Sequence, residues 1–255
     1  MNTFISPTAG CRVRWLDLPG SGIPLVFVHG LGCASSWDYP PIVADKVFAG
    51  RRAILIDLPG YGYSEKPEDY RYSIREQAMV VAELLADINL PHCVLYGHSM
   101  GGSICIEVAA MLTETVCGLV VSEPNFTPGG GVFSQQICRY DETRYVDVVH
   151  NILVANDKTP WAASMAVASP RAVWRGADSL IKGNDWMSMF LQLNRPKALI
   201  FGEQSLPDAD FDKVNSSGVM TLVVPDCGHG LSSENPSGLA AALAQFCQYA
   251  VQHTC

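Results

Sequence analysis

Charged residues are scarce in this sequence. Of 255 residues, 17 are Lys or Arg and 25 are Asp or Glu, which together make 16% of the chain. The formal net charge is -8, and the basic residues form no cluster. Because nucleic acid phosphates and anionic lipid surfaces attract proteins through basic patches, the composition argues against nucleic acid and against a membrane surface as partners.

Long apolar runs and metal-binding patterns are also missing. No stretch approaches the roughly 18 to 20 apolar residues of a membrane span, and the first residues lack the basic and apolar segments of a secretory signal. We therefore expect a cytoplasmic protein. The nine cysteines include no Cys-x-x-Cys pair, and neither a metal-ligand spacing nor a dinucleotide fingerprint occurs. These absences predict that the protein has no disulfide framework and needs no metal or cofactor.

Short aliphatic runs alternate with helical patterns along most of the chain. Near-continuous apolar runs of this length are typical of parallel strands that helices cover on both faces. A capping box at residues 73–76 opens a predicted helix that ends before Pro91, and residues 236–252 form the last predicted helix. The pattern predicts an α/β fold with a doubly wound, mostly parallel sheet. The predicted strands are residues 24–28, 53–56, 93–96, 118–121, 198–201 and 221–224.

The segment 125–185 breaks this alternation. It opens with Pro128-Gly129-Gly130-Gly131 and continues with helical pieces instead of another buried strand. We interpret it as an inserted helical cap, with residues 1–124 and 186–255 forming the core. The large apolar side chains of this segment, and of Trp186 just after it, are candidates for lining an apolar substrate pocket. These residues are Phe133, Trp161, Met165, Trp174 and Trp186.

The motif with the clearest chemical meaning is Gly97-His98-Ser99-Met100-Gly101. It has the pattern G-x-S-x-G, and it follows a predicted strand and opens a predicted helix, which is the context of a nucleophile elbow. A serine on such a tight turn needs small neighbours, because a side chain at Gly97 or Gly101 would collide with the adjoining elements. The turn exposes the hydroxyl and places it near the positive end of the following helix. Ser99 is therefore the predicted nucleophile.

Two further motifs follow other predicted strands. The first is His29-Gly30-Leu31-Gly32, and it supplies backbone amides that can face the nucleophile. Acyl transfer builds an oxyanion, for which we predict the N–H groups of Leu31 and Met100 as donors. The second motif places His229 on a glycine-flanked loop after the last predicted strand. A serine hydroxyl needs a base within hydrogen-bond reach, and His229 has the position for this role.

Taken in order, these motifs resemble those of the α/β-hydrolase superfamily, and the resemblance covers nearly the whole chain. It also includes the turn Asp57-Leu58-Pro59-Gly60-Tyr61-Gly62-Tyr63-Ser64. The resemblance implies an acyl-enzyme mechanism without a cofactor, in which Ser99 attacks a carbonyl, His229 moves the proton and water releases the acid. It implies that Asp57 belongs to a structural turn near the rim of the active site.

The third member of the catalytic triad is displaced from its usual place. The superfamily usually carries an Asp in a Gly-x-x-Asp turn after the strand predicted here at residues 198–201, but this turn reads Gly202-Glu203-Gln204-Ser205. A minority of relatives, including fungal lactonases that open macrocyclic esters, carry a Glu at the end of the strand that follows the elbow helix. Glu123 stands there. We predict Glu123 as the acid, with Asp208 or Asp210 as the alternatives.

The superfamily supports several reactions, so the fold does not choose among them. Haloalkane dehalogenases and epoxide hydrolases resemble this pattern but have Asp at the elbow, and Ser99 argues against both. The sequence favours hydrolysis of a carboxylic ester or lactone with a small to medium apolar substrate. The alternatives are hydrolysis of a carbon-carbon bond, a thioester or an amide, and a non-catalytic receptor for a hydrophobic ligand built on this fold.

Overall fold

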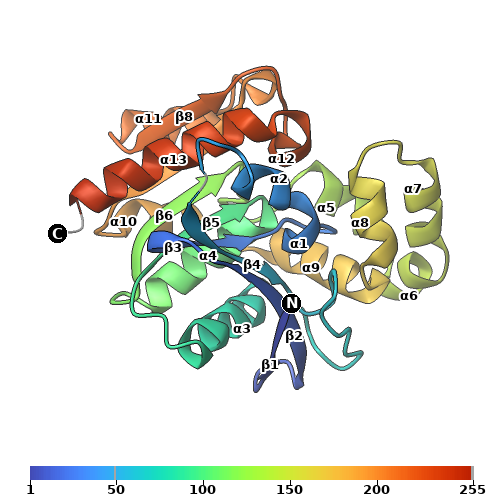
Figure 1. The fold of residues 1–255 in the computed structure, drawn as a ribbon. Coiled ribbons are helices and arrows are strands. Elements are labelled where there is room, and N and C mark those ends of the chain that lie inside the picture. The colour runs from blue at the N-terminus through green and yellow to red at the C-terminus, as the bar shows by residue number, and fades with distance from the viewer. Residues whose placement is uncertain (49, 254–255) are drawn as a thin grey trace.

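The computed structural model describes residues 1–48 and 50–253, which form one twisted sheet covered by helices (Figure 1). The sheet has eight strands in the order β1-β2-β4-β3-β5-β6-β7-β8. The strands from β3 to β8 run parallel, whereas β1 and β2 are antiparallel to their neighbours. This architecture confirms the predicted mostly parallel α/β sheet. The strand bounds are β1 Asn2–Ser6, β2 Cys11–Leu18, β3 Ser21–Val28, β4 Arg51–Asp57, β5 Cys93–His98, β6 Val116–Ser122, β7 Lys197–Gly202 and β8 Met220–Val224.

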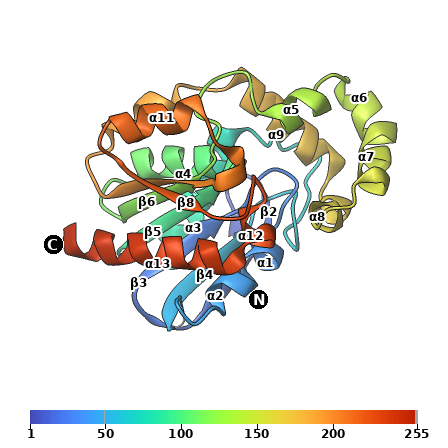
Figure 2. The same ribbon diagram turned by 90° about the horizontal axis from the view of Figure 1, so that it is seen from above.

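Two hydrophobic cores lie on opposite faces of the sheet. Successive residues of β3 alternate between them, since Val26 and Val28 belong to one core and Leu25 and Phe27 to the other. Figure 2 shows α4 and α11 on one side of the strands and α13 on the other. The helices of the core fold are α1 Ser35–Asp38, α2 Pro40–Val43, α3 Ile74–Asp87, α4 Met100–Met111, α11 Ala209–Ser216, α12 Leu231–Glu234 and α13 Pro236–His253.

The helix ends agree with the local sequence signals. At the start of α3 the Ser73 side chain accepts a hydrogen bond from the Glu76 backbone N–H at 3.2 Å, which is the cap that the sequence predicts. The helix ends at Asp87, four residues before Pro91 in the chain. The last helix also lies where the apolar stripe predicts it.

The antiparallel strands β1 and β2 at the edge of the sheet are not among the strands that the sequence predicts. In β2 the buried residues Cys11, Val13 and Trp15 alternate with more exposed ones, so that this strand presents one apolar face. β2 pairs with β4 and supports β1 on its outer side. The two strands form the edge of the sheet opposite β8, where the start of β2 pairs with the end of β4 and β1 packs beside α3.

The segment between the neighbouring strands β6 and β7 is helical. Its helices α5 to α9 gather at one end of the molecule, at the right in Figure 1, and α10 returns to pack beside α4. The bounds are α5 Val132–Ile137, α6 Glu142–Arg144, a π-helical turn Tyr145–Val149, α7 His150–Asn156, α8 Trp161–Val167, α9 Pro170–Lys182 and α10 Trp186–Gln192. Within residues 1–48 and 50–253, no helix has the length and apolar character needed to cross a membrane.

Candidate active site

Ser99 lies on a strained turn between β5 and α4. Its backbone has φ 52° and ψ -121°, which is a conformation that non-glycine residues rarely adopt. The turn is held by hydrogen bonds from the Ser99 N–H to the Ser122 carbonyl at 2.9 Å and from the Gly102 N–H to the Ser99 carbonyl at 2.8 Å. A Cβ atom at Gly97 would lie 2.2 Å from the Gly101 carbonyl oxygen, so the close approach requires glycine there. The geometry is that of the predicted elbow.

His229 and Glu123 form a hydrogen bond across the strand ends. His229 lies on the loop between β8 and α12, and its Nδ1 is 2.6 Å from Oε2 of Glu123. The Glu123 side chain is only 7% exposed, whereas that of His229 is 42% exposed. The second imidazole nitrogen, Nε2, is therefore left for other partners. The loop is anchored by the Gly228 N–H, which donates to Oε2 of Glu234 at 2.5 Å.

The Glu123 carboxylate has several donors besides the imidazole. The Gly202 N–H donates to Oε1 at 2.9 Å, and the Ser205 hydroxyl forms a further hydrogen bond. Burial raises the pKa of Glu123, but the hydrogen bond and charge of His229 and the bonds from Gly202 and Ser205 outweigh it and lower the pKa below its ordinary value. The turn that lacks the usual Asp thus holds the carboxylate supplied by the neighbouring strand.

The two alternative acids are placed differently. Asp208 caps helix α11, where its Oδ1 accepts hydrogen bonds from the backbone N–H groups of Asp210 and Phe211, both at 2.9 Å. Burial is the main cause that raises the pKa of Asp210, with the charge of Asp208 acting in the same direction. Of the three carboxylates weighed from the sequence, the structure brings Glu123 to His229.

The predicted oxyanion donors belong to the turns after β3 and β5. Among the described residues, neither the Leu31 N–H nor the Met100 N–H has a hydrogen-bond acceptor. His29 accepts a hydrogen bond at Nε2 from the Leu58 N–H and donates from Nδ1 to the Gly30 carbonyl, at 3.1 and 2.8 Å. In a trans peptide the N–H points opposite to the carbonyl, so this bond turns the Leu31 N–H away from the His29 ring.

Asp57 holds the structural turn near this loop. Its Oδ1 accepts a hydrogen bond from the Ser36 N–H at 2.9 Å, and its Oδ2 accepts from the Ser36 hydroxyl at 2.7 Å and the Tyr63 N–H at 3.0 Å. The residue is fully buried. All of these bonds tie one loop to another, as expected for a structural residue.

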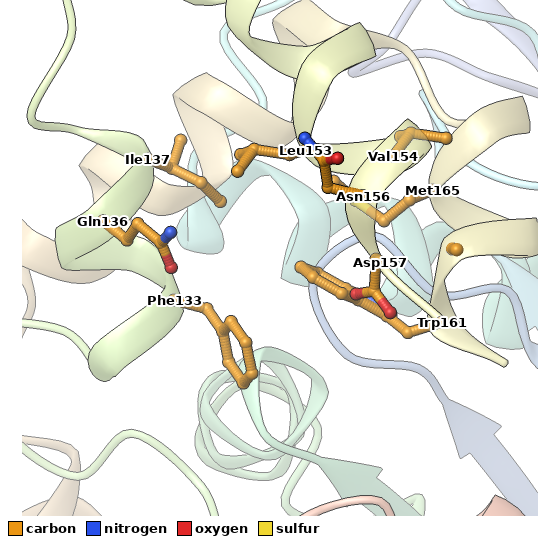
Figure 3. Close-up of a pocket in the computed structure, with 10 residues that line it drawn as sticks. Phe133, Gln136, Ile137, Leu153, Val154, Asn156, Asp157, Trp161 and Met165 are labelled. Carbon is orange, nitrogen blue, oxygen red and sulfur yellow. The ribbon is translucent and has the colours of Figure 1, made fainter. Parts of the chain in front are cut away.

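An apolar cavity of about 200 Å³ lies among α5, α7 and α8 (Figure 3). Three of the predicted pocket residues, Phe133, Trp161 and Met165, line it. The Phe133 ring is 5.0 Å from that of Trp161 and 6.4 Å from that of His229, measured between centroids. Trp161 Nε1 donates to the Leu31 carbonyl at 2.9 Å, so Phe133 and Trp161 connect the wall of the cavity to the imidazole and to the turn after β3. The remaining lining residues are Gln136, Ile137, Leu153, Val154, Asn156, Asp157 and Ala162.

The other two predicted pocket residues lie outside this cavity. Trp186 is 2% exposed, and its Nε1 donates to Oε1 of Glu107 at 3.0 Å, so it packs α10 against α4. Trp174 on α9 donates from Nε1 to the Tyr140 carbonyl at 2.9 Å. Both indoles satisfy their N–H groups within the fold, which is the usual requirement for a buried Trp. The prediction differs from the structure at Trp174 and Trp186 because the sequence shows where aromatic residues occur but not the direction in which each side chain points.

One site feature was not predicted from the sequence. The His98 ring, which precedes Ser99, lies 4.7 Å from the His229 ring, measured between centroids. Its Nδ1 is 3.0 Å from the Ser122 hydroxyl, which is 2.8 Å from the Tyr96 hydroxyl. The elbow motif already contains His98, and β6 ends with Ser122, but only the strand register brings them opposite each other.

Across the described residues, no three side chains of His, Cys, Asp or Glu come together in a way that could hold a metal ion. The Glu123–His229 pair is the arrangement that general-base chemistry needs, since a carboxylate at Nδ1 fixes the imidazole tautomer and leaves Nε2 to accept a proton.

A family model described as "Alpha/beta hydrolase family" matches residues 25–242. The chain belongs to this family. It thus has the fold of a family of hydrolases, in agreement with the resemblance of its motifs.

Two curated relatives match the chain in part. The dihydrolipoyllysine-residue acetyltransferase component of the acetoin cleaving system of Pseudomonas putida is 37% identical over 114 residues, which cover 43% of this chain and 29% of that protein. The 2-hydroxymuconate semialdehyde hydrolase of Pseudomonas sp. (strain CF600) is 32% identical over 114 residues, 44% of this chain and 40% of that protein. The matched segments thus span less than half the length of these relatives.

Solved structures match over nearly the full length. A thermophilic esterase from Thermogutta terrifontis has a TM-score of 0.80 at 19% identity, with 98% of both chains covered. The N-acyl homoserine lactonase AidH has a TM-score of 0.76 at 21% identity, with 99% of both chains covered. At such low identity the similarity shows the shared fold alone.

Proposed function

We propose that this protein hydrolyses carboxylic esters or lactones through an acyl-enzyme, with Ser99 as nucleophile, His229 as general base and Glu123 as the acid that orients His229. The observation that carries the proposal is the 2.6 Å hydrogen bond between Nδ1 of His229 and the buried Glu123 carboxylate. The pair lies beside the Ser99 turn, because the Ser99 N–H donates to the carbonyl of Ser122, the residue before Glu123, and the His229 ring lies 4.7 Å from that of His98. A serine hydroxyl becomes an effective nucleophile when such an oriented imidazole accepts its proton.

The proposed reaction has two halves. In the first, Ser99 Oγ attacks the carbonyl carbon as its proton passes to Nε2 of His229, and the N–H groups of Leu31 and Met100 stabilise the oxyanion. Collapse of the tetrahedral intermediate breaks the ester bond, and His229 returns the proton to the leaving alkoxide. In the second half, His229 takes a proton from water and the resulting hydroxide attacks the acyl-enzyme. Collapse of the second tetrahedral intermediate breaks the bond between the acyl carbon and Ser99 Oγ, which takes the proton back from His229 as the acid is released.

The proposed substrate is apolar and of small to medium size. The cavity behind Phe133 and Trp161 is lined mainly by aliphatic and aromatic side chains, and Asp157 contributes a carboxylate to its lining. Such a lining favours a neutral hydrocarbon group and repels an anionic one. Within this proposal, residues 125–185 form a cap over the site, while residues 1–124 and 186–255 form the core. The esterase and the lactonase of similar fold support the same reaction class.

Hydrolysis of a carbon-carbon bond is the second candidate. It is favoured by the partial match to a 2-hydroxymuconate semialdehyde hydrolase at 32% identity. A diketone-type substrate that releases two fragments would identify this activity, whereas thioester and amide substrates would test the remaining acyl-transfer reactions.

The proposed function is tested by assaying p-nitrophenyl esters of increasing acyl length beside a panel of lactones, with Ser99→Ala as the matched control. We expect turnover of neutral esters or lactones and slow turnover of negatively charged ones. Turnover in the control should fall to the residual level that binding and the oxyanion donors provide, on the order of 10³ to 10⁴ over water. Tight binding of hydrophobic ligands without appreciable turnover would instead identify a receptor, and equal rates for both proteins would contradict the proposal.

A further inference from the structure

The ring of His98 contacts the proposed general base from the side of the elbow. His98 is the last residue of β5, and its ring centroid lies 4.7 Å from that of His229, with the two planes inclined by 48°. The Phe133 ring, at 6.4 Å, also approaches the His229 ring. His229 therefore has an aromatic neighbour supplied by the rigid strand that positions Ser99.

His98 is held in place by buried groups of two adjacent strands. Its Nδ1 is 3.0 Å from the Ser122 hydroxyl, and that hydroxyl is 2.8 Å from the hydroxyl of Tyr96. Tyr96 and Ser122 are both fully buried, and Ser122 is paired with His98 in the register of β5 and β6. A side chain anchored through such groups has little freedom to rotate, so the His98 ring forms a fixed surface.

His98 is neutral at neutral pH, and a neutral ring is favourable beside a base that becomes cationic. Burial is the main cause that lowers the pKa of His98, to about 3, and the nearby His229 acts in the same direction. The charge of Glu123 and a hydrogen bond to the Ser122 backbone oppose this shift. The titratable groups facing the ring are thus His229 on its loop, Glu123 after β6 and the Tyr96 hydroxyl on β5. A neutral His98 does not repel the imidazolium that forms at His229 during attack.

One hydrogen bond at Nδ1 does not by itself fix the plane of the His229 ring. The imidazole can still tilt about the line that joins Nδ1 to Oε2 of Glu123, and its loop is flanked by Gly228 and Gly230. A contact on the ring face removes this freedom. Such precision matters, because a misplacement of about 1 Å in a catalytic group costs on the order of 10²-fold in rate.

We propose that His98 is a positioning residue for the hydrolysis proposed above and that it acts through His229. Its neutral ring supports the His229 imidazole, so that Nε2 stays directed at Ser99 while Glu123 holds Nδ1. The inference rests on the proposed function, and it assigns to His98 neither proton transfer nor substrate binding.

Two variants separate the ring face from the hydrogen bond. His98→Phe keeps an aromatic face but loses the bond to Ser122, whereas His98→Asn keeps a polar group near Ser122 but loses the face. The rate of Ser99 labelling by a fluorophosphonate and the kcat for an ester are measured for each. We expect a loss on the order of 10- to 100-fold in kcat for His98→Asn with little change in KM, and a smaller loss for His98→Phe, which keeps the aromatic face but not its anchor.

Two further readouts distinguish positioning from a purely structural role. The acid limb of kcat/KM against pH should keep its midpoint in His98→Phe, because a neutral ring is replaced by another neutral ring. In NMR spectra of the wild-type protein with labelled histidines, the His98 ring should stay neutral down to about pH 4. This measurement needs no variant, so it tests the inference even if a substituted chain fails to fold.

The inference is overturned if His98→Asn is as active as the wild type, if His98→Phe is as slow as His98→Asn, or if His98 titrates near the ordinary histidine pKa of about 6.5. Failure of the proposed function has a different signature, since the wild-type protein itself would then neither react with the fluorophosphonate nor turn over esters.

Discussion

Glu123 reaches His229 from a left-handed backbone conformation, with φ 41°. Such a conformation is unfavourable for a residue with a side chain, and it persists only where the surrounding structure enforces it. Here the Glu123 N–H donates to the Ile200 carbonyl at 3.1 Å, and its carboxylate accepts from the Gly202 N–H at 2.9 Å. Both bonds come from β7, so the neighbouring strand holds the carboxylate in place.

The first prediction at the residue scale concerns this carboxylate. Glu123→Gln should lower kcat/KM on the order of 10³- to 10⁴-fold, because the neutral amide neither fixes the His229 tautomer nor stabilises the imidazolium. Asp208→Asn and Asp210→Asn are the matched controls, and both should stay close to wild type, since an Asn at position 208 still caps α11. A nearly normal Glu123→Gln enzyme beside an inactive Asp208→Asn or Asp210→Asn enzyme would reverse the assignment.

Asp38, near the turn that carries Leu31, provides a prediction about pH. Burial is the main cause that raises the pKa of Asp38 to about 6, against hydrogen bonds from Ala34 and Cys33 that lower it. A raised pKa means that the protonated carboxyl favours folding at low pH and that this contribution is lost as the pH rises through about 6. Asp38→Asn stays neutral at every pH and avoids the loss.

Asp38→Asn should therefore match the wild type in free energy of unfolding near pH 4 and exceed it by about 1 to 2 kcal/mol at pH 7.5, after allowance for partial solvent exposure. Urea unfolding at the two pH values measures the difference. A variant that is equally stable relative to wild type at both values, or less stable at pH 7.5, would show that the carboxyl is not penalised by burial.

At the scale of elements, the elbow depends on close packing between the start of α4 and the end of β3. A Cβ atom at Gly101 would lie 2.2 Å from the Val28 carbonyl oxygen and 2.5 Å from that of His29. Neither backbone atom can move without shifting the strand that carries the Leu31 turn. Gly101→Ala should therefore lower activity on the order of 10²-fold or more and destabilise the fold by about 1 to 3 kcal/mol.

The matched control for this prediction is Gly131→Ala. Gly131 has φ -89°, and the nearest atom to its added Cβ would be Nδ2 of Asn125 at 3.3 Å. This variant should keep both its activity and its melting temperature. If Gly101→Ala behaved in the same way, the elbow would not have the tight geometry described here.

The elements differ in how far the sequence could predict them. The central strands are buried on both faces, so nearly every residue is apolar and the runs stand out. β2 instead alternates Arg12 and Arg14 with buried residues, and its neighbour β1 is half exposed, so neither has a continuous apolar run. An aromatic residue such as Trp186 is a candidate for the pocket on sequence alone, but its hydrogen bond to Glu107 on α4 follows only from the tertiary structure.

The residues of the candidate site also differ in how far the sequence predicts them. Ser99 and His229 stand in local motifs whose backbone requirements are visible in the sequence. The contacts of His98 with His229 and of Ser205 with Glu123 join segments far apart in the chain, and only the packed strand ends bring them together. The sequence alone therefore predicts the proposed reacting groups but not most of the groups that contact them.

At the scale of the whole molecule, the proposed mechanism uses only side chains and backbone amides of this chain. Dialysis against a chelator should therefore leave the rate of ester turnover unchanged, since the described residues form no cluster of metal ligands. The comparison is made with the same sample after metal ions are added back. Activity that falls on dialysis and returns with a divalent cation would require a different mechanism.

The most direct test of the central claim is to locate a covalent adduct on the folded protein. We expect a fluorophosphonate to label the wild-type chain at one site per molecule, with the modified peptide identified by mass spectrometry as the one containing Ser99. Ser99→Ala should lose labelling and most esterase activity while keeping the wild-type circular dichroism spectrum and melting temperature. Labelling that persists in Ser99→Ala, or that maps to another serine in the wild type, would contradict the account.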